Sequence, residues 1–277
     1  MNLILIIMNL SLGRGGGTRE QFYDLYEIAA KHLKSCFPEL KIGGPALCGN
    51  VEWGRDFLCE MQKRKVPIDF FSWHIYTNCV GHVVNRAAAV KETMIKYGYG
   101  NAESILNEWN YVNGWTGDEF VYSIEQIIGL KGAAFALAVM CVSQKSDIID
   151  MLMYYDARPT VFNGLFDFYT LRPLKGYYPF LWYGMFYDLE CEVRSESDPK
   201  DIYTLCGIDK NGKTIATVTY YINDDTAEDK KIKVDFGKPG KYEVYFLDVE
   251  HDPKVPQITD NLEFTLQRNA SILIKEI

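Results

Sequence analysis

Short apolar runs alternate with longer amphipathic stretches from residue 1 to residue 189. A run of four to eight apolar residues is typical of a buried strand, whereas apolar residues three or four apart are typical of a helix. The stretch that begins at Thr18 shows the helical pattern, because Thr18 and Gln21 form a capping box and Pro38 ends the stretch. The pattern as a whole predicts strands at 3–8, 40–42, 68–76, 104–110 and 148–155, and helices at 18–37, 52–65, 80–97, 120–142 and 174–189.

The pattern changes after residue 189, where short runs rich in β-branched and aromatic residues are separated by turn signals. Asp-Lys-Asn-Gly at 209–212 and Gly-Lys-Pro-Gly at 237–240 are two such signals. We expect a small antiparallel β-sandwich with strands at 202–208, 213–221, 230–236, 242–248, 262–267 and 271–277.

These two textures predict two domains, as the length of 277 residues also favours. Strands that alternate with helices form βαβ units, which build a parallel sheet with right-handed crossovers. We therefore predict an α/β domain at 1–189 and a β-sandwich accessory domain at 190–277.

Composition excludes several classes of protein. The net charge is −8 and no block of Lys or Arg occurs, which argues against binding to nucleic acid. The apolar run at 1–8 lacks the basic start and cleavage site of a signal peptide and is too short to span a bilayer, so we expect no membrane association. Seven cysteines without a C-x-x-C pair suit a reducing compartment such as the cytoplasm, although the localisation stays unknown.

The chemistry of the chain is concentrated at 104–110, Ser-Ile-Leu-Asn-Glu-Trp-Asn. An apolar run ends there in a carboxylate (Glu108), an indole (Trp109) and an amide (Asn110). In parallel α/β barrels the active site lies where strands end and loops begin. Side chains of these types are common in sugar-binding sites. The alternative is that Glu108 is an ordinary exposed glutamate after a strand.

Two further features have both a functional and a structural interpretation. His74 and Tyr76 end the apolar strand at 68–76, so they either line a site or hydrogen-bond within the core. The glycines at 13–17 precede a helix and could cradle a phosphate, but the Lys-Ser/Thr of a phosphate loop is missing. Phosphate binding is therefore only a minor alternative.

Several segments, taken in order, carry a resemblance to a known family. They are Lys-Ile-Gly-Gly-Pro-Ala at 41–46, Asp-Phe-Phe-Ser-Trp-His-Ile-Tyr at 69–76, Asn-Glu-Trp-Asn at 107–110, Tyr-Tyr-Asp-Ala-Arg at 154–158, Gly-Leu-Phe at 164–166 and the helix at 175–189. Over about residues 18–189 the chain resembles the C-terminal part of the β-xylosidase and α-L-iduronidase family of retaining glycoside hydrolases, family 39. The β-domain that follows is also similar to that of the family.

The resemblance implies a (β/α)8 TIM-type barrel, with the four later strands as its fifth to eighth. Glu108 would then end the seventh strand, where the family keeps its catalytic nucleophile. The resemblance and the aromatic content together suggest a substrate-binding set around Glu108: His74, Tyr76, Trp109, Asn110, Trp115, Asp156 and Phe166.

Two departures from the family stand at the N-terminal side. The acid/base of the family is the Glu of an Asn-Glu-Pro, and no Asn-Glu-Pro occurs in this sequence. The matching region at 7–12 has Leu10 in that place. Such a barrel needs about 250 residues, so we expect one that is incomplete at its N-terminal end, without its first three strands.

Two hypotheses follow. The first is a retaining, β-xylosidase-like glycosidase that acts on a glycoside or oligosaccharide through Glu108. The second is a truncated or degenerate, non-catalytic carbohydrate-binding or structural homologue that lacks the acid/base. Because unpaired strand edges invite association, a second copy or a partner chain would cover the open barrel edge. No pair of histidines has metal-ligand spacing, and we expect neither a metal nor a cofactor.

Overall fold

The computed structural model describes residues 4–6, 17–198 and 200–277, and its chain divides into two compact units. The first unit comprises residues up to Tyr76, then 81–109 and 146–155. The second comprises 77–80, 110–145 and 156–277. The limits of these compact units differ from the predicted domain boundary between residues 189 and 190. That boundary stays a prediction.

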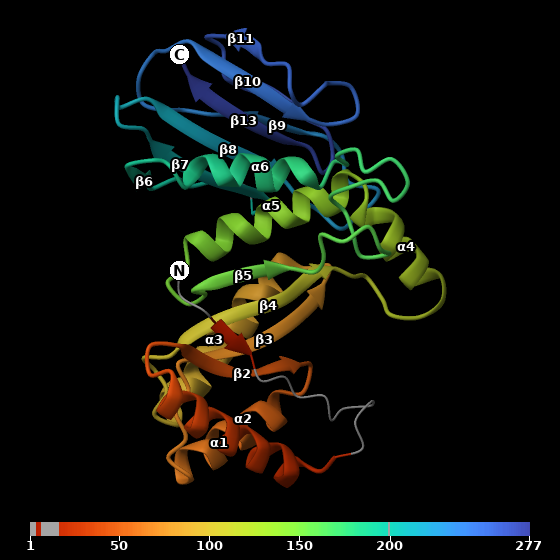
Figure 1. The fold of residues 1–277 in the computed structure, drawn as a ribbon. Helices are drawn as coiled ribbons and strands as arrows, with labels where there is room; N and C mark the ends of the chain where they lie inside the picture. The colour runs from red at the N-terminus through yellow and green to blue at the C-terminus, as the bar shows by residue number, and fades with distance from the viewer. Residues whose placement is uncertain (1–3, 7–16, 199) are drawn as a thin grey trace. The chain divides into compact units, whose positions relative to one another are not determined.

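A five-stranded sheet forms the centre of the first unit, with its strands in the order β1-β2-β3-β4-β5 (Figure 1). The pairings recorded for β1 with β2, β2 with β3 and β4 with β5 are parallel. Its strands are β1 (Ile4–Ile6), β2 (Lys41–Cys48), β3 (Phe70–Thr77), β4 (Glu103–Tyr111) and β5 (Met151–Tyr154).

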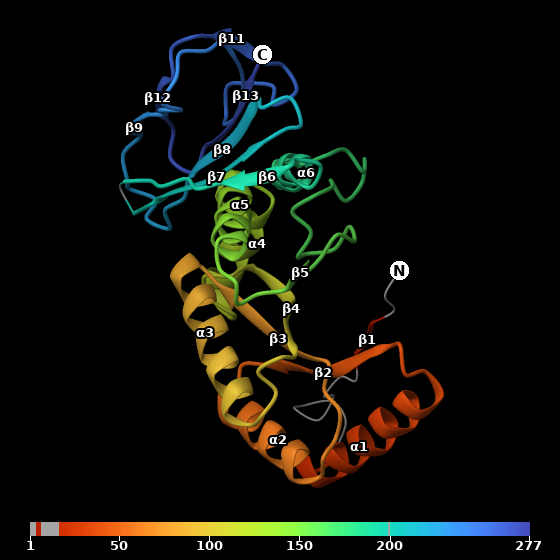
Figure 2. The ribbon, with the colours of Figure 1, turned by 90° about the vertical axis from the view of Figure 1, so that its left-hand side faces the viewer.

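Three helices connect the first four strands: α1 (Arg19–Cys36), α2 (Val51–Lys63) and α3 (Val80–Lys96). Figure 2 shows all three on the same side of the sheet, as right-handed crossovers require. The predicted capping box forms, since Gln21 N donates to Thr18 Oγ1 and Thr18 N donates to Gln21 Oε1. Helices α1 and α2 pack through aromatic side chains, and the rings of Tyr26 and Phe57 meet edge-on with their centroids 4.9 Å apart.

A very close approach aligns β2 with β3. A Cβ atom on Gly43 would lie 2.1 Å from the carbonyl oxygen of Phe70, so only glycine fits there. Beyond this contact the pairing shifts between Gly44 and Leu47, and it ends with Cys48 opposite His74. The carboxyl ends of β2 and β3 therefore lie side by side.

The second unit contains two antiparallel sheets, ordered β11-β10-β13-β8-β7-β6 and β12-β9. Side chains from both sheets share one apolar core, in which Ile272 and Val218 pack with Leu266. This arrangement agrees with the predicted sandwich. Its strands are β6 (Cys191–Val193), β7 (Ile202–Ile208), β8 (Thr214–Tyr220), β9 (Lys230–Lys233), β10 (Tyr242–Leu247), β11 (Gln257–Thr259), β12 (Glu263–Leu266) and β13 (Ser271–Glu276).

Three helices belong to the second unit: α4 (Gly117–Ile127), α5 (Leu130–Gln144) and α6 (Tyr177–Phe186). Helix α5 is buried nearly all round and packs against α6, β7 and β8 (Figure 1). In the described part of the chain no single helix is long and apolar enough to cross a membrane; α4 and α5 reach that length and composition only as a pair bent by 75°.

Several predicted elements need correction. The single helix predicted at 120–142 is wrong, because the chain bends at Gly129 between α4 and α5. Gly132 makes the bend possible, since a Cβ there would lie 2.6 Å from the carbonyl oxygen of Ile127. The predicted helix at 174–189 is shorter, and the strands β6 and β11 were not predicted.

The α/β class with a parallel sheet and separate antiparallel sheets is confirmed. A complete barrel is not present among the described residues, whose parallel sheet has five strands. Of the predicted strand at 3–8, residues Ile4–Ile6 form β1. The rest of that strand, the Gly13–Gly16 part of the glycine loop and the 7–12 region with Leu10 lie outside the described residues.

Candidate active site

The carboxyl ends of β3 and β4 bring three of the predicted residues together in the first unit. His74 and Tyr76 are two residues apart on β3, so their side chains lie on the same face of the sheet. Glu108 comes from β4, the neighbouring strand. The family resemblance implied this grouping, because it made the strands of His74 and Glu108 neighbours, and the ends of adjacent parallel strands meet at one edge of the sheet.

Both polar contacts of Glu108 fall on one carboxylate oxygen. Tyr76 donates its hydroxyl proton to Oε2 over 2.8 Å, and Nδ1 of His74 lies 3.2 Å from the same oxygen. Among the described residues, neither side chain contacts the other carboxylate oxygen, Oε1. The Glu108 side chain is 25% exposed, so it is sheltered but reachable. The arrangement fixes one oxygen and leaves the other able to react.

His74 lies beside this carboxylate as a neutral imidazole. Burial lowers the pKa of His74, and the opposing effect of the Glu108 charge does not overcome it. Because a carboxylate oxygen only accepts, we assign the imidazole proton to Nδ1. Nε2 is then an acceptor, and it is buried without a hydrogen-bond partner among the described residues. The imidazole ring beside Glu108 therefore keeps one buried acceptor without a partner among the described residues.

Tyr76 stays protonated and therefore donates. Burial, and then the hydrogen bond to Glu108, raise the pKa of its hydroxyl. The ring of Tyr155 meets the Tyr76 ring edge-on at 6.3 Å. Burial, and then the charge of Glu108, raise the pKa of the thiol of Cys48, which lies at the end of β2. Tyr76 and Cys48 thus keep their protons beside Glu108.

Trp109, the predicted stacking residue, lies in the core of the first unit. Its side chain is 1% exposed, and its ring meets Tyr154 edge-on at 5.4 Å. The observed role is packing behind the strand that carries Glu108. Stacking on a sugar stays a prediction for this residue.

Three other predicted residues belong to the second unit and meet around Phe162. Asn110 donates Nδ2–H to the carbonyl oxygen of Phe162 over 2.9 Å, and the Asp156 N–H donates to the same oxygen over 3.4 Å. The Trp115 ring lies 6.2 Å from the Phe162 ring and is 56% exposed. Phe162 therefore organises the loops that follow β4 and β5.

The last two predicted residues, Asp156 and Phe166, make local contacts within the second unit. Asp156 is 7% exposed and pairs with Arg158 at 3.0 Å, which occupies one of its oxygens. Phe166 packs against Tyr177 with 5.6 Å between ring centroids. Substrate contact by Asn110, Trp115, Asp156 or Phe166 stays a prediction.

Sequence reasoning missed three residues that help to build these surroundings: Cys48, Tyr155 and Phe162. Cys48 ends β2 and Tyr155 directly follows β5, so the rule that located Glu108 at a strand end could have found both. Phe162 lies in a loop and carries no comparable signal, because it acts through its backbone carbonyl group as well as its ring.

A metal site and a large cavity are two other features that could mark function. No group of three or more His, Cys, Asp or Glu side chains is placed to hold a metal ion within residues 17–198 and 200–277. A cavity of about 580 Å³ opens in the second unit between α6 and the β6–β7 pair, with Tyr183, Tyr187 and Cys206 in its lining. None of the predicted site residues lines it.

Comparison with known proteins supports the predicted resemblance. Residues 14–110 match the family model described as glycosyl hydrolases family 39, a stretch that includes His74, Tyr76 and Glu108. Over 65 residues the chain is 45% identical to a beta-xylosidase of Geobacillus stearothermophilus. That match covers 23% of this chain and 13% of the relative, so it spans a small part of the relative's length. The resemblance to family 39 is thereby confirmed over part of the chain.

Solved structures show the same fold over nearly the whole chain. A glucosidase from Croceicoccus marinus superposes with a TM-score of 0.73 and 19% identity, covering 98% of this chain and 68% of that one. An α-L-arabinofuranosidase from Thermotoga maritima, solved as an arabinose complex, gives a TM-score of 0.69, 19% identity and coverage of 98% and 66%. At this level of identity the likeness concerns the fold.

Proposed function

We propose that the chain acts as a retaining glycosidase with Glu108 as its nucleophile. The premise is the match of residues 14–110 to the family 39 model. The single observation that carries the proposal is the one-sided support of Glu108, with Tyr76 and His74 both on Oε2. The name of the Geobacillus relative directs the choice of substrate to a β-xyloside or a similar pentoside.

In the proposed reaction Oε1 of Glu108 attacks the anomeric carbon of the sugar. The bond from Oε1 to that carbon forms while the bond to the leaving oxygen breaks, and the leaving oxygen takes the electron pair. Tyr76 keeps its hydrogen bond to Oε2, which becomes the carbonyl oxygen of the glycosyl ester, and His74 stays next to that oxygen. Water then attacks the anomeric carbon and loses a proton to the solvent, while the bond to Oε1 breaks and its electron pair returns to Glu108. The sugar leaves with net retention.

The buried acceptor on the His74 ring suits a sugar. Nε2 of His74 has no hydrogen-bond partner among the described residues and can accept one bond, and sugar hydroxyl groups are donors. A site built to bond such hydroxyls discriminates against sugars that lack them. Nε2 of His74 would therefore help to select the glycoside.

A second carboxyl group about 5 Å from the nucleophile would complete the retaining mechanism. We assign none, because Leu10 stands where the family has its acid/base and that region lies outside the described residues. Loss of general acid catalysis costs about 10²–10⁴-fold in rate. The chain should therefore prefer substrates whose leaving group departs without protonation.

Trapping with 2-deoxy-2-fluoro glycosides tests the proposal, since these reagents need a nucleophile but little acid catalysis. Xylosides, arabinofuranosides and glucosides with dinitrophenyl leaving groups would be incubated with the protein and followed by intact and peptide mass. We expect one sugar adduct, on Glu108. Glu108→Gln should abolish it, whereas Glu103→Gln, at the opposite end of β4, should keep it. An adduct that survives Glu108→Gln would refute the assignment.

One observation favours a second candidate function, sugar binding without turnover. No Asn-Glu-Pro occurs in the 277 residues. A folded protein that binds xylose-like glycosides in calorimetry, but never forms an adduct with any of the activated reagents, would support this alternative over the first.

A further inference from the structure

The two strands that carry the candidate site continue directly into loops of the second unit. Tyr76 on β3 is followed by the 77–80 segment, and Glu108 on β4 is followed within two residues by the 110–117 segment. The two segments stay paired beyond the site, because Val112 N–H donates to the Thr77 carbonyl oxygen over 3.2 Å. Whatever holds these segments also holds the ends of the two strands.

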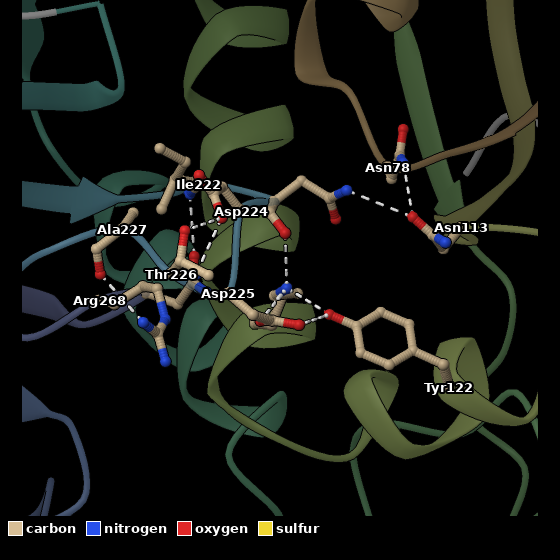
Figure 3. Close-up of polar contacts among 12 residues, drawn as sticks. Asn78, Asn113, Tyr122, Ile222, Asp224, Asp225, Thr226, Ala227 and Arg268 are labelled. Carbon is tan, nitrogen blue, oxygen red and sulfur yellow. Dashed lines mark hydrogen bonds and ion pairs between the residues drawn. The ribbon is translucent and has the colours of Figure 1, made fainter. Parts of the chain in front are cut away.

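A bridge of asparagines joins the two segments to a turn of the antiparallel domain. Oδ1 of Asn113 accepts from Nδ2 of Asn78 at 2.8 Å and from Nδ2 of Asn223 at 3.3 Å (Figure 3). Oδ1 of Asn223 in turn accepts from the Tyr111 hydroxyl at 2.7 Å. The Tyr221 hydroxyl donates to the Asn78 carbonyl oxygen. One amide oxygen thus gathers the loops after β3, β4 and β8.

A buried lysine fixes the turn that supplies Asn223. Lys131 on α5 is 3% exposed, and its ammonium group reaches the Asn223 carbonyl oxygen at 2.9 Å and Oδ1 of Asp225 at 2.6 Å. It also contacts the Tyr122 hydroxyl at 2.5 Å, while that hydroxyl donates to Oδ2 of Asp225 at 2.6 Å (Figure 3). A buried ammonium group must be paired, so this turn has one favoured arrangement.

Burial of Asp225 would raise its pKa, but the hydrogen bonds from Lys131 and Tyr122 outweigh burial and lower the pKa of this carboxyl. The carboxylate is therefore charged at neutral pH. Its charge keeps the lysine, and with it the Asn223 backbone, in place.

We propose that Asn113 and Asn223, held by Lys131, are positioning residues that set the geometry of Tyr76 and Glu108 through the segments that follow β3 and β4. They act through the backbone and do not touch the reacting atoms. This inference rests on the proposed function for its kinetic consequence, but the positioning itself can be measured without activity.

The test compares two nearly isosteric changes at one residue. Asn113→Leu removes the acceptor that Asn78 and Asn223 share, whereas Asn113→Asp keeps an acceptor oxygen in the same place. Asn211→Leu, in the exposed turn between β7 and β8, controls for loss of any asparagine. Far-ultraviolet circular dichroism would establish that all three variants are folded.

Two measurements are then made on each variant. Amide hydrogen exchange should speed up at 74–80 and 106–114 in Asn113→Leu, stay near the original rate at 41–48, and be rescued in Asn113→Asp. Trapping by the 2-fluoro glycoside at saturation should slow roughly tenfold in Asn113→Leu, with less than about twofold change in reagent affinity. Asn113→Asp should recover most of that rate.

The outcomes separate the two proposals. Absence of an adduct in the unchanged protein would count against Glu108 as nucleophile, and hydrogen exchange would still decide the positioning role. Equal exchange at 74–80 and 106–114 in Asn113→Leu and Asn113→Asp would overturn the positioning proposal, whatever the trapping shows.

Discussion

The hydroxyl of Tyr76 donates to Oε2 of Glu108, and His74 contacts that same oxygen, so the two oxygens of the carboxylate are chemically different. A carboxylate with both oxygens hydrogen-bonded would be a weaker nucleophile, because each bond withdraws charge. Here the Tyr76 hydroxyl restrains the group through Oε2, while Oε1 keeps its lone pairs. The candidate reaction depends on this asymmetry.

Tyr76→Phe tests the value of the hydroxyl. The change keeps the ring and its contact with Tyr155 but removes the donor. Since the hydroxyl holds the carboxylate by Oε2, its loss would misplace Oε1, and misplacement of a reacting atom can cost about 10²-fold in rate. We therefore expect the trapping rate at Glu108 to fall by one to two orders of magnitude. Tyr169→Phe, at a tyrosine that is 88% exposed, is the matched control and should leave the rate as it was. Equal rates in both variants would show that the hydroxyl is dispensable.

The buried His74 predicts a specific dependence of stability on pH. Its pKa is lowered in the folded protein, so the unfolded chain binds the proton more tightly. The contribution of His74 to stability is therefore complete above its ordinary pKa of about 6.5, and it is lost as pH falls through the lowered value. Urea unfolding at pH 7.5 and pH 5 should show a larger loss for the original protein than for His74→Gln. A loss of the same size in the two proteins would contradict this account.

The Lys131–Asp225 pair predicts unequal costs for its two truncations. Asp225→Ala strips the carboxylate from an ammonium group that is 3% exposed, and we expect it to destabilise the fold by about 2–3 kcal/mol. Lys131→Met leaves a carboxylate that is 54% exposed and can be hydrated, so it should cost less, about 1 kcal/mol. Denaturant unfolding of both variants gives the order. The reverse order would mean that Lys131 is hydrated in solution.

The approach of β2 to β3 predicts an intolerant glycine. In Gly43→Ala the new methyl group would lie 2.1 Å from a backbone oxygen, so one of the two strands must move, at a cost of about 3 kcal/mol or more. Gly184→Ala on α6 meets no atom within 4 Å and should be neutral or slightly stabilising. Thermal unfolding of the two variants measures the difference, and a Gly43→Ala protein as stable as Gly184→Ala would exclude the close approach.

The elements with a strong periodic signal could be predicted from sequence, and the weak ones could not. Strand β7 lies at the predicted residues because its apolar run is bounded by a clear turn at 209–212. Strands β6 and β11 have three residues each and exposed side chains, so no apolar run marks them. The bend at Gly129 was hidden because apolar residues continue on both sides of it.

The candidate site was predictable as a set of strand ends but not in its contacts. The spacing of His74 and Tyr76 gives one face of β3, whereas the choice of a single oxygen of Glu108 depends on the register between neighbouring strands. Lys131 carried a readable signal, since it is a lone charge in the apolar stretch 130–142. Its partner Asp225 is distant in sequence, and no local pattern connects the two.

Burial of helix α5 limits how this polypeptide can be dissected. The helix has no water-facing side, and it packs on β7 and β8, which follow it by more than fifty residues. An expression fragment that stops at residue 189 would present α5 to solvent without those strands, and we expect it to be insoluble. The strand β5, which comes after α5 in sequence, belongs to the other compact unit. The two units are interleaved along the gene, so neither can be cloned as one uninterrupted segment.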